Sequence, residues 1–219
     1  MKLDEINNVL GIEDSYKAPN RIMEILLGDV NKREKIFKEF LSVDSDLTID
    51  QFHEYFQEEH AERKTKKQDF TPSTISQILT RLTESQGDNG LRYEVACGTG
   101  SIVITKWNAD RISKGIFKYK PSQFIYYCEE LSDRTIPFLL FNLMIRGMNA
   151  VVLHGDSITR EFKQIYLIQN DGDDHMKFSS LNIMPHSKDA EKYFNVVKWT
   201  EDYNEHTESK WVLDLLKEV

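Results

Sequence analysis

Apolar side chains recur along the first third of the chain at the spacing of amphipathic helices. Over residues 20–41 and 49–56 they return every three or four positions, which places them on one face of a helix. These positions are Ile22, Ile25, Leu26, Ile36, Phe37, Phe40, Ile49, Phe52, Tyr55 and Phe56. Gly28-Asp29 interrupts the pattern as a helix break does. The pattern therefore predicts an N-terminal helical region over residues 1–67.

After Lys67 the pattern changes to short apolar runs separated by helical stretches. The runs occupy residues 92–96, 124–128, 150–153 and 164–169. Their length is typical of strands, and strands that alternate with helices form βαβ units with a parallel sheet. We therefore predict an α/β domain over residues 68–219. In such sheets ligands bind beyond the carboxyl ends of the strands, so candidate chemistry is expected in the residues that follow each run.

The first run leads into Glu94-Val95-Ala96-Cys97-Gly98-Thr99-Gly100 and then into a helical stretch. Small residues allow the backbone to turn tightly and to approach a ligand closely. A helix that begins directly after such a turn points its free amides at an anionic group. Residues 96–100, called the glycine turn below, are thus a candidate binding loop, although Gly-x-Gly alone also occurs in ordinary turns.

Acidic residues follow the next two runs. Glu129-Glu130 comes after the second run, and a carboxylate there can accept hydrogen bonds from both hydroxyls of a ribose. Asp156 comes after the third run and can accept from an exocyclic amine such as that of adenine. Amides and two acids at successive strand ends are what a nucleoside with a carboxylate tail requires.

These motifs resemble those of the methylation subunits of type I restriction-modification systems. Gln68-Asp69-Phe70-Thr71-Pro72 resembles the family's Gln-x-Phe-Thr-Pro motif, and residues 94–100 resemble its Asp-Pro-Ala-Cys-Gly-Ser-Gly loop. The remaining motifs follow in the family's order: Glu130, Asn142-Leu143, Arg146-Gly147 and Gly155-Asp156-Ser157. The resemblance covers residues 51–170, and the short chain looks like the truncated relatives carried by phages and mobile elements.

The resemblance implies a Rossmann-like fold, with a mostly parallel sheet, that binds S-adenosylmethionine (SAM) for methylation of adenine N6 in DNA. By position, Phe70 and Thr71 would flank the methionine end of the cofactor. Glu130 would hold the ribose and Asp156 the adenine. The residues that would cradle the cofactor are Glu94, Ala96, Cys97, Gly98 and Gly100. The family's Asp-Pro is Glu94-Val95 here, which keeps the acid but moves it outward by a methylene.

The family's catalytic motif is Asn-Pro-Pro followed by an aromatic residue after the fourth strand. Its Asn and a proline carbonyl accept hydrogen bonds from the target amine, while the flipped base stacks on the ring. The corresponding slot here holds Asn170-Asp171-Gly172-Asp173, without proline or an adjacent aromatic residue. Either Asn170 or Asp171 serves as the acceptor with Phe178 as the stacking ring, or the catalytic loop is lost while the cofactor loop survives. In the second case the chain would act by binding a host protein, such as a restriction-modification subunit or a regulator.

The composition of the chain bears on whether it binds DNA, a membrane or a metal ion. The net charge of −8 argues against unaided binding to duplex DNA, because phosphate contacts need clustered Lys and Arg. DNA binding would need a partner subunit. No apolar run approaches the roughly 20 residues of a membrane span, and two cysteines without a signal core are typical of a cytoplasmic protein. His53 and His60 lack the spacing of a His-Glu-x-x-His site, so no metal site is predicted.

Overall fold

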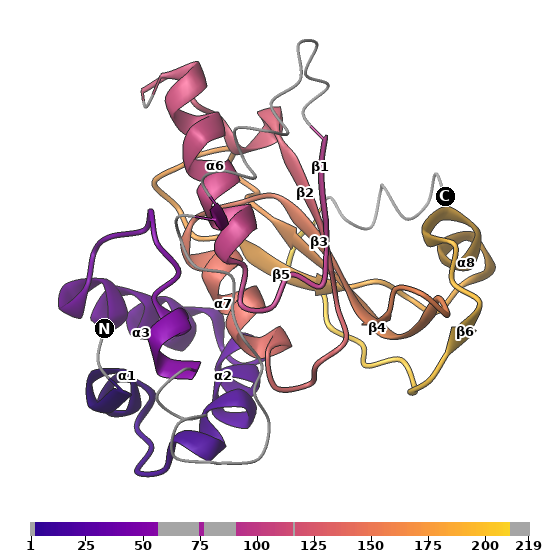
Figure 1. Ribbon diagram of the computed structural model, residues 1–219, viewed down its shortest axis with the longest axis horizontal. Coiled ribbons are helices and arrows are strands. Elements are labelled where there is room, and N and C mark those ends of the chain that lie inside the picture. The colour runs from indigo at the N-terminus through magenta and orange to yellow at the C-terminus, as the bar shows by residue number, and fades with distance from the viewer. Residues whose placement is uncertain (1–2, 57–74, 77–90, 116, 211–219) are drawn as a thin grey trace.

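The computed structural model describes residues 3–56, 75–76, 91–115 and 117–210 of the chain (Figure 1). The N-terminal part forms the helices α1 (Leu3–Leu10), α2 (Ala18–Leu26) and α3 (Val30–Val43), with a short 3-10 helix at Ser15–Lys17. Residues 52–56 are helical as well. Asp29 caps α3, because its side chain accepts from the Lys32 amide at 2.9 Å. The described residues before position 57 are therefore mainly helical, as their apolar spacing predicts.

One mixed sheet forms the centre of the molecule. Its strands are β1 (Leu91–Val95), β2 (Ile125–Glu130), β3 (Ala150–Asp156), β4 (Glu161–Gln169), β5 (Ser180–Ile183) and β6 (Lys198–Trp199). The order is β1-β2-β3-β4-β5, and β6 pairs with β4. The β1/β2, β2/β3 and β4/β6 pairs are parallel, whereas β3/β4 and β4/β5 are antiparallel. This mostly parallel α/β sheet, with helices on its faces, agrees with the predicted Rossmann-like class.

The direction of β4 corrects the simple βαβ expectation. A parallel connection needs a crossover of a dozen or more residues, but only a tight turn separates Asp156 from Glu161. In that turn the Arg160 amide donates to the Asp156 carbonyl at 2.8 Å. β4 therefore runs back beside β3, and Ile168 pairs with Ala150 at the start of β3. The residues after β4 thus lie at the amino edge of β1–β3, where these strands begin, and not at the carboxyl edge, where they end.

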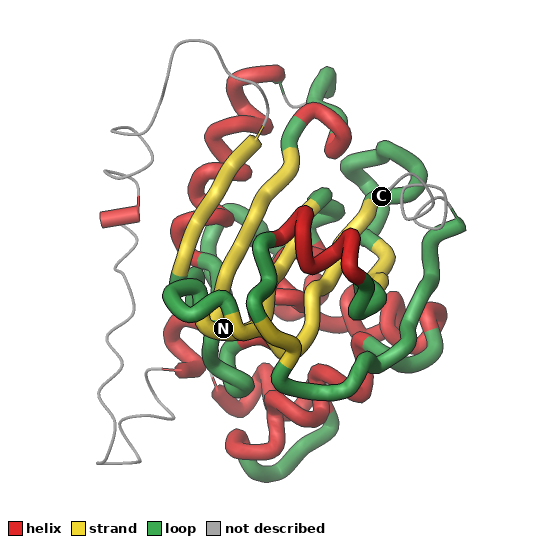
Figure 2. Tube along the Cα trace, turned by 90° about the vertical axis from the view of Figure 1, so that its right-hand side faces the viewer, coloured by secondary structure: helices red, strands yellow, loops and turns green. Residues whose placement is uncertain are grey.

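Two apolar clusters hold the sheet from opposite faces. One face is covered by α6 (Ser101–Lys114), α7 (Ile136–Ile145) and the N-terminal helices, while α8 (Lys188–Phe194) lies on the other (Figures 1 and 2). Every residue of α7 is buried, because this helix lies between the sheet and the N-terminal helices. Phe141 of α7 meets Phe37 of α3 with ring centroids 4.7 Å apart. The N-terminal helices therefore share one core with the α/β part.

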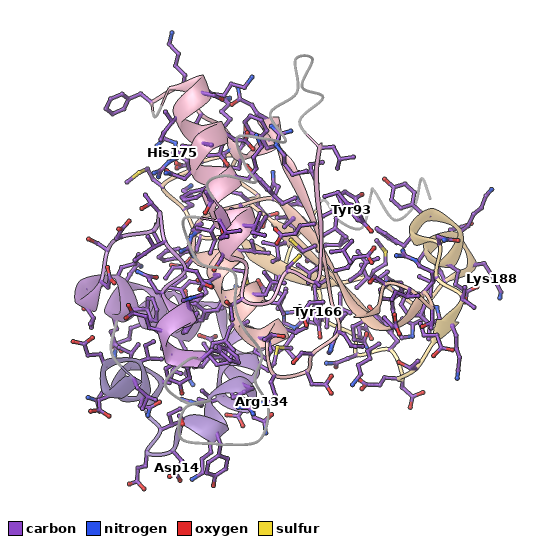
Figure 3. The ribbon with its side chains drawn as sticks, in the orientation of Figure 1. Asp14, Tyr93, Arg134, Tyr166, His175 and Lys188 are labelled. Atoms are coloured by element: carbon purple, nitrogen blue, oxygen red, sulfur yellow. The ribbon has the colours of Figure 1, made fainter. Side chains whose placement is uncertain are left out.

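The face under α8 has a smaller cluster, in which Ala190 and Phe194 join Val151, Leu153 and Phe162. This cluster leaves much of β1 uncovered, since Leu91, Tyr93 and Val95 are all exposed. Figure 3 shows Tyr93 on the side of β1 that faces away from the N-terminal helices. No helix within the described residues is long and apolar enough to cross a membrane.

Candidate functional site

The glycine turn connects the end of β1 to the first residue of α6. Three of its residues have positive φ angles, Ala96 at 57°, Gly98 at 57° and Gly100 at 100°. Gly100 is the N-cap of α6, and a Cβ at this position would come within 2.9 Å of Leu139 Cδ1. Only glycine combines that left-handed backbone with so little space. The sequence thus forces a sharp turn that directs the amides of α6 toward the carboxyl edge.

Glu130 contacts the glycine turn directly. Its Oε2 accepts from the Gly98 amide at 2.8 Å, and its Oε1 accepts from the Ser132 amide at 2.8 Å. The carboxylate is buried, with only 8% of the residue exposed. Each carboxylate oxygen keeps a further lone pair for a hydroxyl donor. The predicted cradle and the predicted ribose acid are therefore brought together in one place.

Glu94 lies on the side of β1 that faces the helices, two residues before the glycine turn. Burial raises the pKa of its carboxyl to about 8, opposed by a hydrogen bond from the Val103 amide in the first turn of α6. Its Oε2 atom is shielded from solvent and accepts no hydrogen bond from the described residues. A buried acceptor without a donor is costly, so this atom is suited to a cationic or donor group of a ligand.

Glu129 turns to the opposite face of the sheet, because successive side chains of a strand alternate. Its Oε1 accepts from the Tyr93 hydroxyl at 2.7 Å and from Arg160 Nη1 at 2.8 Å. Only 2% of Glu129 is exposed. Of the two acids considered at this strand end, only Glu130 contacts the glycine turn through its carboxylate. Glu129 reaches the turn through its backbone carbonyl, which accepts from the Cys97 amide at 3.1 Å, and its carboxylate pairs with Arg160.

Asp156 lies at the same carboxyl edge, two residues beyond His154, which pairs with Glu130 across β2 and β3. Its Oδ1 accepts from the Ile158 amide at 2.7 Å and from the Thr159 amide at 3.2 Å. These hydrogen bonds hold the pKa of Asp156 below its usual value. Asp156 therefore closes the β3/β4 turn through its Oδ1.

Asn170 lies at the opposite edge of the sheet. It is buried, and its Nδ2 donates to the carbonyls of Gly147, Asp174 and Lys177 at 2.9–3.1 Å. Its Oδ1 accepts from the Asp174 amide at 3.0 Å. These contacts use the whole amide to hold the turn over residues 170–177. The structure thus does not bring Asn170 to the glycine turn, because β4 runs antiparallel to β3.

Asp171 and Phe178, which were predicted to act with Asn170, also make their contacts away from the glycine turn. Asp171 accepts from Ser180 Oγ at 2.6 Å and from Gln169 Nε2 at 3.0 Å. Phe178 packs its ring against Phe37, with centroids 5.1 Å apart, so it belongs to the core. The interpretation in which Asn170 or Asp171 accepts from the target amine beside a stacking Phe178 is not supported by this geometry.

A comparison with protein families finds one family model that spans all of these loops. Residues 44–213 match the family model of N-6 DNA methylases, which is more than half of the chain. The chain belongs to the N-6 DNA methylase family. It is thus a protein of the adenine-N6 DNA methyltransferase type, as the sequence motifs predict. No curated protein and no solved structure matches this N-6 DNA methylase.

The family match begins at residue 44, well before the domain boundary predicted at 67/68. Phe70 and Thr71, the predicted neighbours of the cofactor's methionine end, lie outside the described residues. Among the residues that are described, no group of three or more His, Cys, Asp or Glu side chains could hold a metal ion. The predicted cofactor-binding residues that the structure describes are therefore those of the glycine turn, Glu94, Glu130 and Asp156.

Asp50 contacts the glycine turn, although no motif in the sequence indicates it. Its Oδ2 accepts from the hydroxyls of Thr99 and Ser101, which flank Gly100. Its Oδ1 accepts from Asn142 Nδ2 at 2.9 Å. The contacts join segments 49 to 92 residues apart in the chain, so no local pattern could reveal them. The one signal was indirect, since Asn142 is a family motif residue with no role assigned to it.

Proposed function

We propose that this N-6 DNA methylase homologue binds S-adenosylmethionine at the carboxyl edge of β1–β3, between the glycine turn and Glu130. The observation that carries the proposal is the hydrogen bond from the Gly98 amide to Glu130 Oε2, at 2.8 Å. It brings a backbone turn that can receive a ligand and an acid that can hold a ribose into direct contact. Family membership makes SAM the expected cofactor.

The residues present fit the chemical groups of that cofactor. The first amides of α6 suit the methionine carboxylate, because the amino end of a helix attracts anions. Oε2 of Glu94, which accepts no hydrogen bond from the described part of the chain, suits the methionine ammonium. Glu130 suits the ribose hydroxyls, and Oδ2 of Asp156, which does not bind the turn amides, suits the adenine amine. When bound, SAM would supply an electrophilic methyl group, and these side chains would bind and orient it.

Methyl transfer would also need hydrogen-bond acceptors for the amine of a target adenine. We place the hydrogen-bond acceptors for a target adenine outside Asn170 and Asp171, because both hold the turn at the amino edge. With a net charge of −8, contacts to DNA phosphates would need a partner subunit that carries Lys and Arg. The function that the geometry supports best is therefore cofactor binding, with methyl transfer dependent on a partner.

Calorimetric titration of the full chain with SAM tests this proposal. Wild-type protein is expected to bind one equivalent of cofactor, and Glu130→Gln is expected to bind it much more weakly. Glu129→Gln is the matched control, because it removes the same charge one residue away on the opposite face. Absence of binding to folded wild-type protein, or equal losses in the two variants, would refute the site.

A second candidate function is binding to a restriction-modification subunit. It is favoured by the exposed apolar side chains on β1, of which Tyr93 is 60% exposed and Val95 is 44% exposed. Contiguous apolar surface of this kind is common at protein interfaces. Replacing both residues with lysine should abolish a complex with a purified methylation subunit in gel filtration and leave SAM binding intact. No complex with the wild-type chain at micromolar concentrations would reject this candidate.

A further inference from the structure

The Asp50 carboxylate bridges the two sides of Gly100. One oxygen, Oδ2, accepts from the Thr99 hydroxyl before this glycine and from Ser101 Oγ after it, the latter at 2.9 Å. Thr99 is 1% exposed, so its hydroxyl is directed into the protein. Ser101 is the first residue of α6, where a negative charge is favourable because of the helix dipole. A single oxygen atom thus fixes the residues on both sides of the left-handed glycine.

Asn142 of α7 binds both Asp50 and the backbone of the glycine turn. It is fully buried, and its Nδ2 donates to Asp50 Oδ1 and to the Thr99 carbonyl, each at 2.9 Å. Its Oδ1 accepts from Arg146 Nη1 at 2.9 Å. Because the carbonyl end of the amide faces a guanidinium and the amino end faces a carboxylate, the orientation of Asn142 is determined. The amide therefore links Asp50 and the backbone of the glycine turn to α7.

Arg146 holds the segment that carries Asp50. Its Nε donates to the Leu47 carbonyl at 2.8 Å, and its Nη2 donates to the Ile49 carbonyl at 2.6 Å. Burial lowers the pKa of Arg146 to about 10, with the nearby Asp50 opposing the shift. The guanidinium is thus charged at neutral pH. The backbone just before Asp50 is pinned to α7, so the carboxylate is presented to the glycine turn at a fixed position.

From these contacts we infer that Asp50 is a positioning residue for the glycine turn, and that it sets the turn geometry that receives the cofactor. This role rests on the cofactor binding proposed above. Glu130 fixes the turn through the Gly98 amide on one side. Asp50 fixes it through Thr99 and Ser101 on the other side. Without Asp50, Gly100 would lose the contacts that restrain its neighbours, while the contact of the turn with Glu130 would remain.

Hydrogen exchange of the ligand-free full chain tests the role of Asp50 directly. In the wild-type protein Asp50 also caps the helical residues 52–56, because it accepts from the Phe52 amide. Asp50→Ser removes the bridge from Asp50 to Thr99 and Ser101 but keeps a residue that can cap this helix. Thr99→Val with Ser101→Ala removes the bridge from the other side and leaves Asp50 in place. Both variants should exchange the amides of residues 97–101 at least about tenfold faster than wild type. Glu54→Ala, at an exposed position nearby, should not.

Calorimetry on the same proteins separates positioning from general stability. Both bridge variants should bind SAM at least about tenfold more weakly at a temperature well below unfolding, and Asp50→Asn should recover part of the affinity because it keeps one acceptor oxygen. Unchanged exchange at residues 97–101 in both variants would overturn the inference. If wild-type protein bound no SAM, the proposed function would fail, and the exchange rates would still decide whether Asp50 fixes the turn.

Discussion

The glycine turn and the turn over residues 170–177 are both short and polar, yet their hydrogen bonds are directed differently. In the second turn the amide of Asn170 is saturated by three carbonyls and one amide of its own neighbourhood. Beside the glycine turn, Glu94 has a buried oxygen that accepts no hydrogen bond from the described residues, and Glu130 keeps lone pairs next to the backbone of the turn. The contrast shows that a polar loop is a candidate site when its groups remain available, whatever its composition.

The contrast between the two turns would be contradicted if Asn170 took part in cofactor binding. We expect Asn170→Ala to lower the free energy of unfolding by about 2–4 kcal/mol, because buried carbonyls and an amide lose their partner. SAM affinity, measured on the folded protein, should stay within about twofold of wild type. Urea denaturation measures the free energy of unfolding, and calorimetry measures the SAM affinity.

Asp171→Ala is the matched control for that experiment. Its contacts to Ser180 and Gln169 are exposed, so its loss should cost less than about 1 kcal/mol. An Asn170→Ala protein that unfolds normally but binds SAM tenfold more weakly would show that the two edges of the sheet are coupled.

Glu130→Gln should produce the largest effect on binding. The change removes the charge that accepts from Gly98 and Ser132, and we expect a loss of about 1–3 kcal/mol in SAM binding. Glu129→Gln, on the other face, should change the dissociation constant less than about twofold. Calorimetric titration at equal protein concentration compares the two. Similar losses would mean that the effect arises from the sheet and not from a ribose contact.

The pH dependence of binding sharpens the role of Glu94. The pKa of its carboxyl is raised to about 8 in the ligand-free protein, so the group is mostly protonated at pH 6–7. An ammonium group favours the ionised form and lowers this pKa, so binding releases a proton. SAM affinity should therefore rise by up to about tenfold per pH unit from pH 6 toward pH 8.

The rise should end near pH 8, where the methionine amine itself begins to lose its proton at a pKa of about 7.7–8.0. Glu94→Gln should flatten the profile below pH 8, because the side chain no longer ionises. Titrations in two buffers of different ionisation enthalpy count the protons released. A wild-type protein that releases none at pH 7 would exclude Glu94 as the partner of the ammonium.

Local sequence patterns predicted those parts of the fold that depend on nearby residues. The apolar run at 124–128 became β2 (Ile125–Glu130), and the small residues around Gly98 and Gly100 became a turn with positive φ angles. The direction of β4 was not predictable in this way, because it depends on whether Asp156 closes a tight turn. The predicted approach of Glu130 to the glycine turn followed from the rule that parallel strands end at one edge.

The contacts of Asp50 could not have been predicted from the sequence for a different reason. Its partners Thr99 and Asn142 are remote in the chain, and an isolated Asp just before a helix is typical of an N-cap. The boundary predicted at 67/68 separated Asp50 from the motifs that it contacts. Long-range hydrogen bonds of this kind appear only when the N-terminal helices are packed against α7.

The smallest effect on SAM binding is expected for a change of Asp156, because its Oδ1 already closes the β3/β4 turn. Asp156→Ala should weaken SAM binding only a few-fold, since one exposed acceptor is lost. A sharper measurement compares S-adenosylhomocysteine with its inosine analogue, which lacks the exocyclic amine. Wild-type protein should prefer the adenine form, and Asp156→Ala should lose that preference. If the variant kept it, adenine would be recognised by another group, and the carboxyl edge after β3 would be a structural turn like the one that holds Asn170.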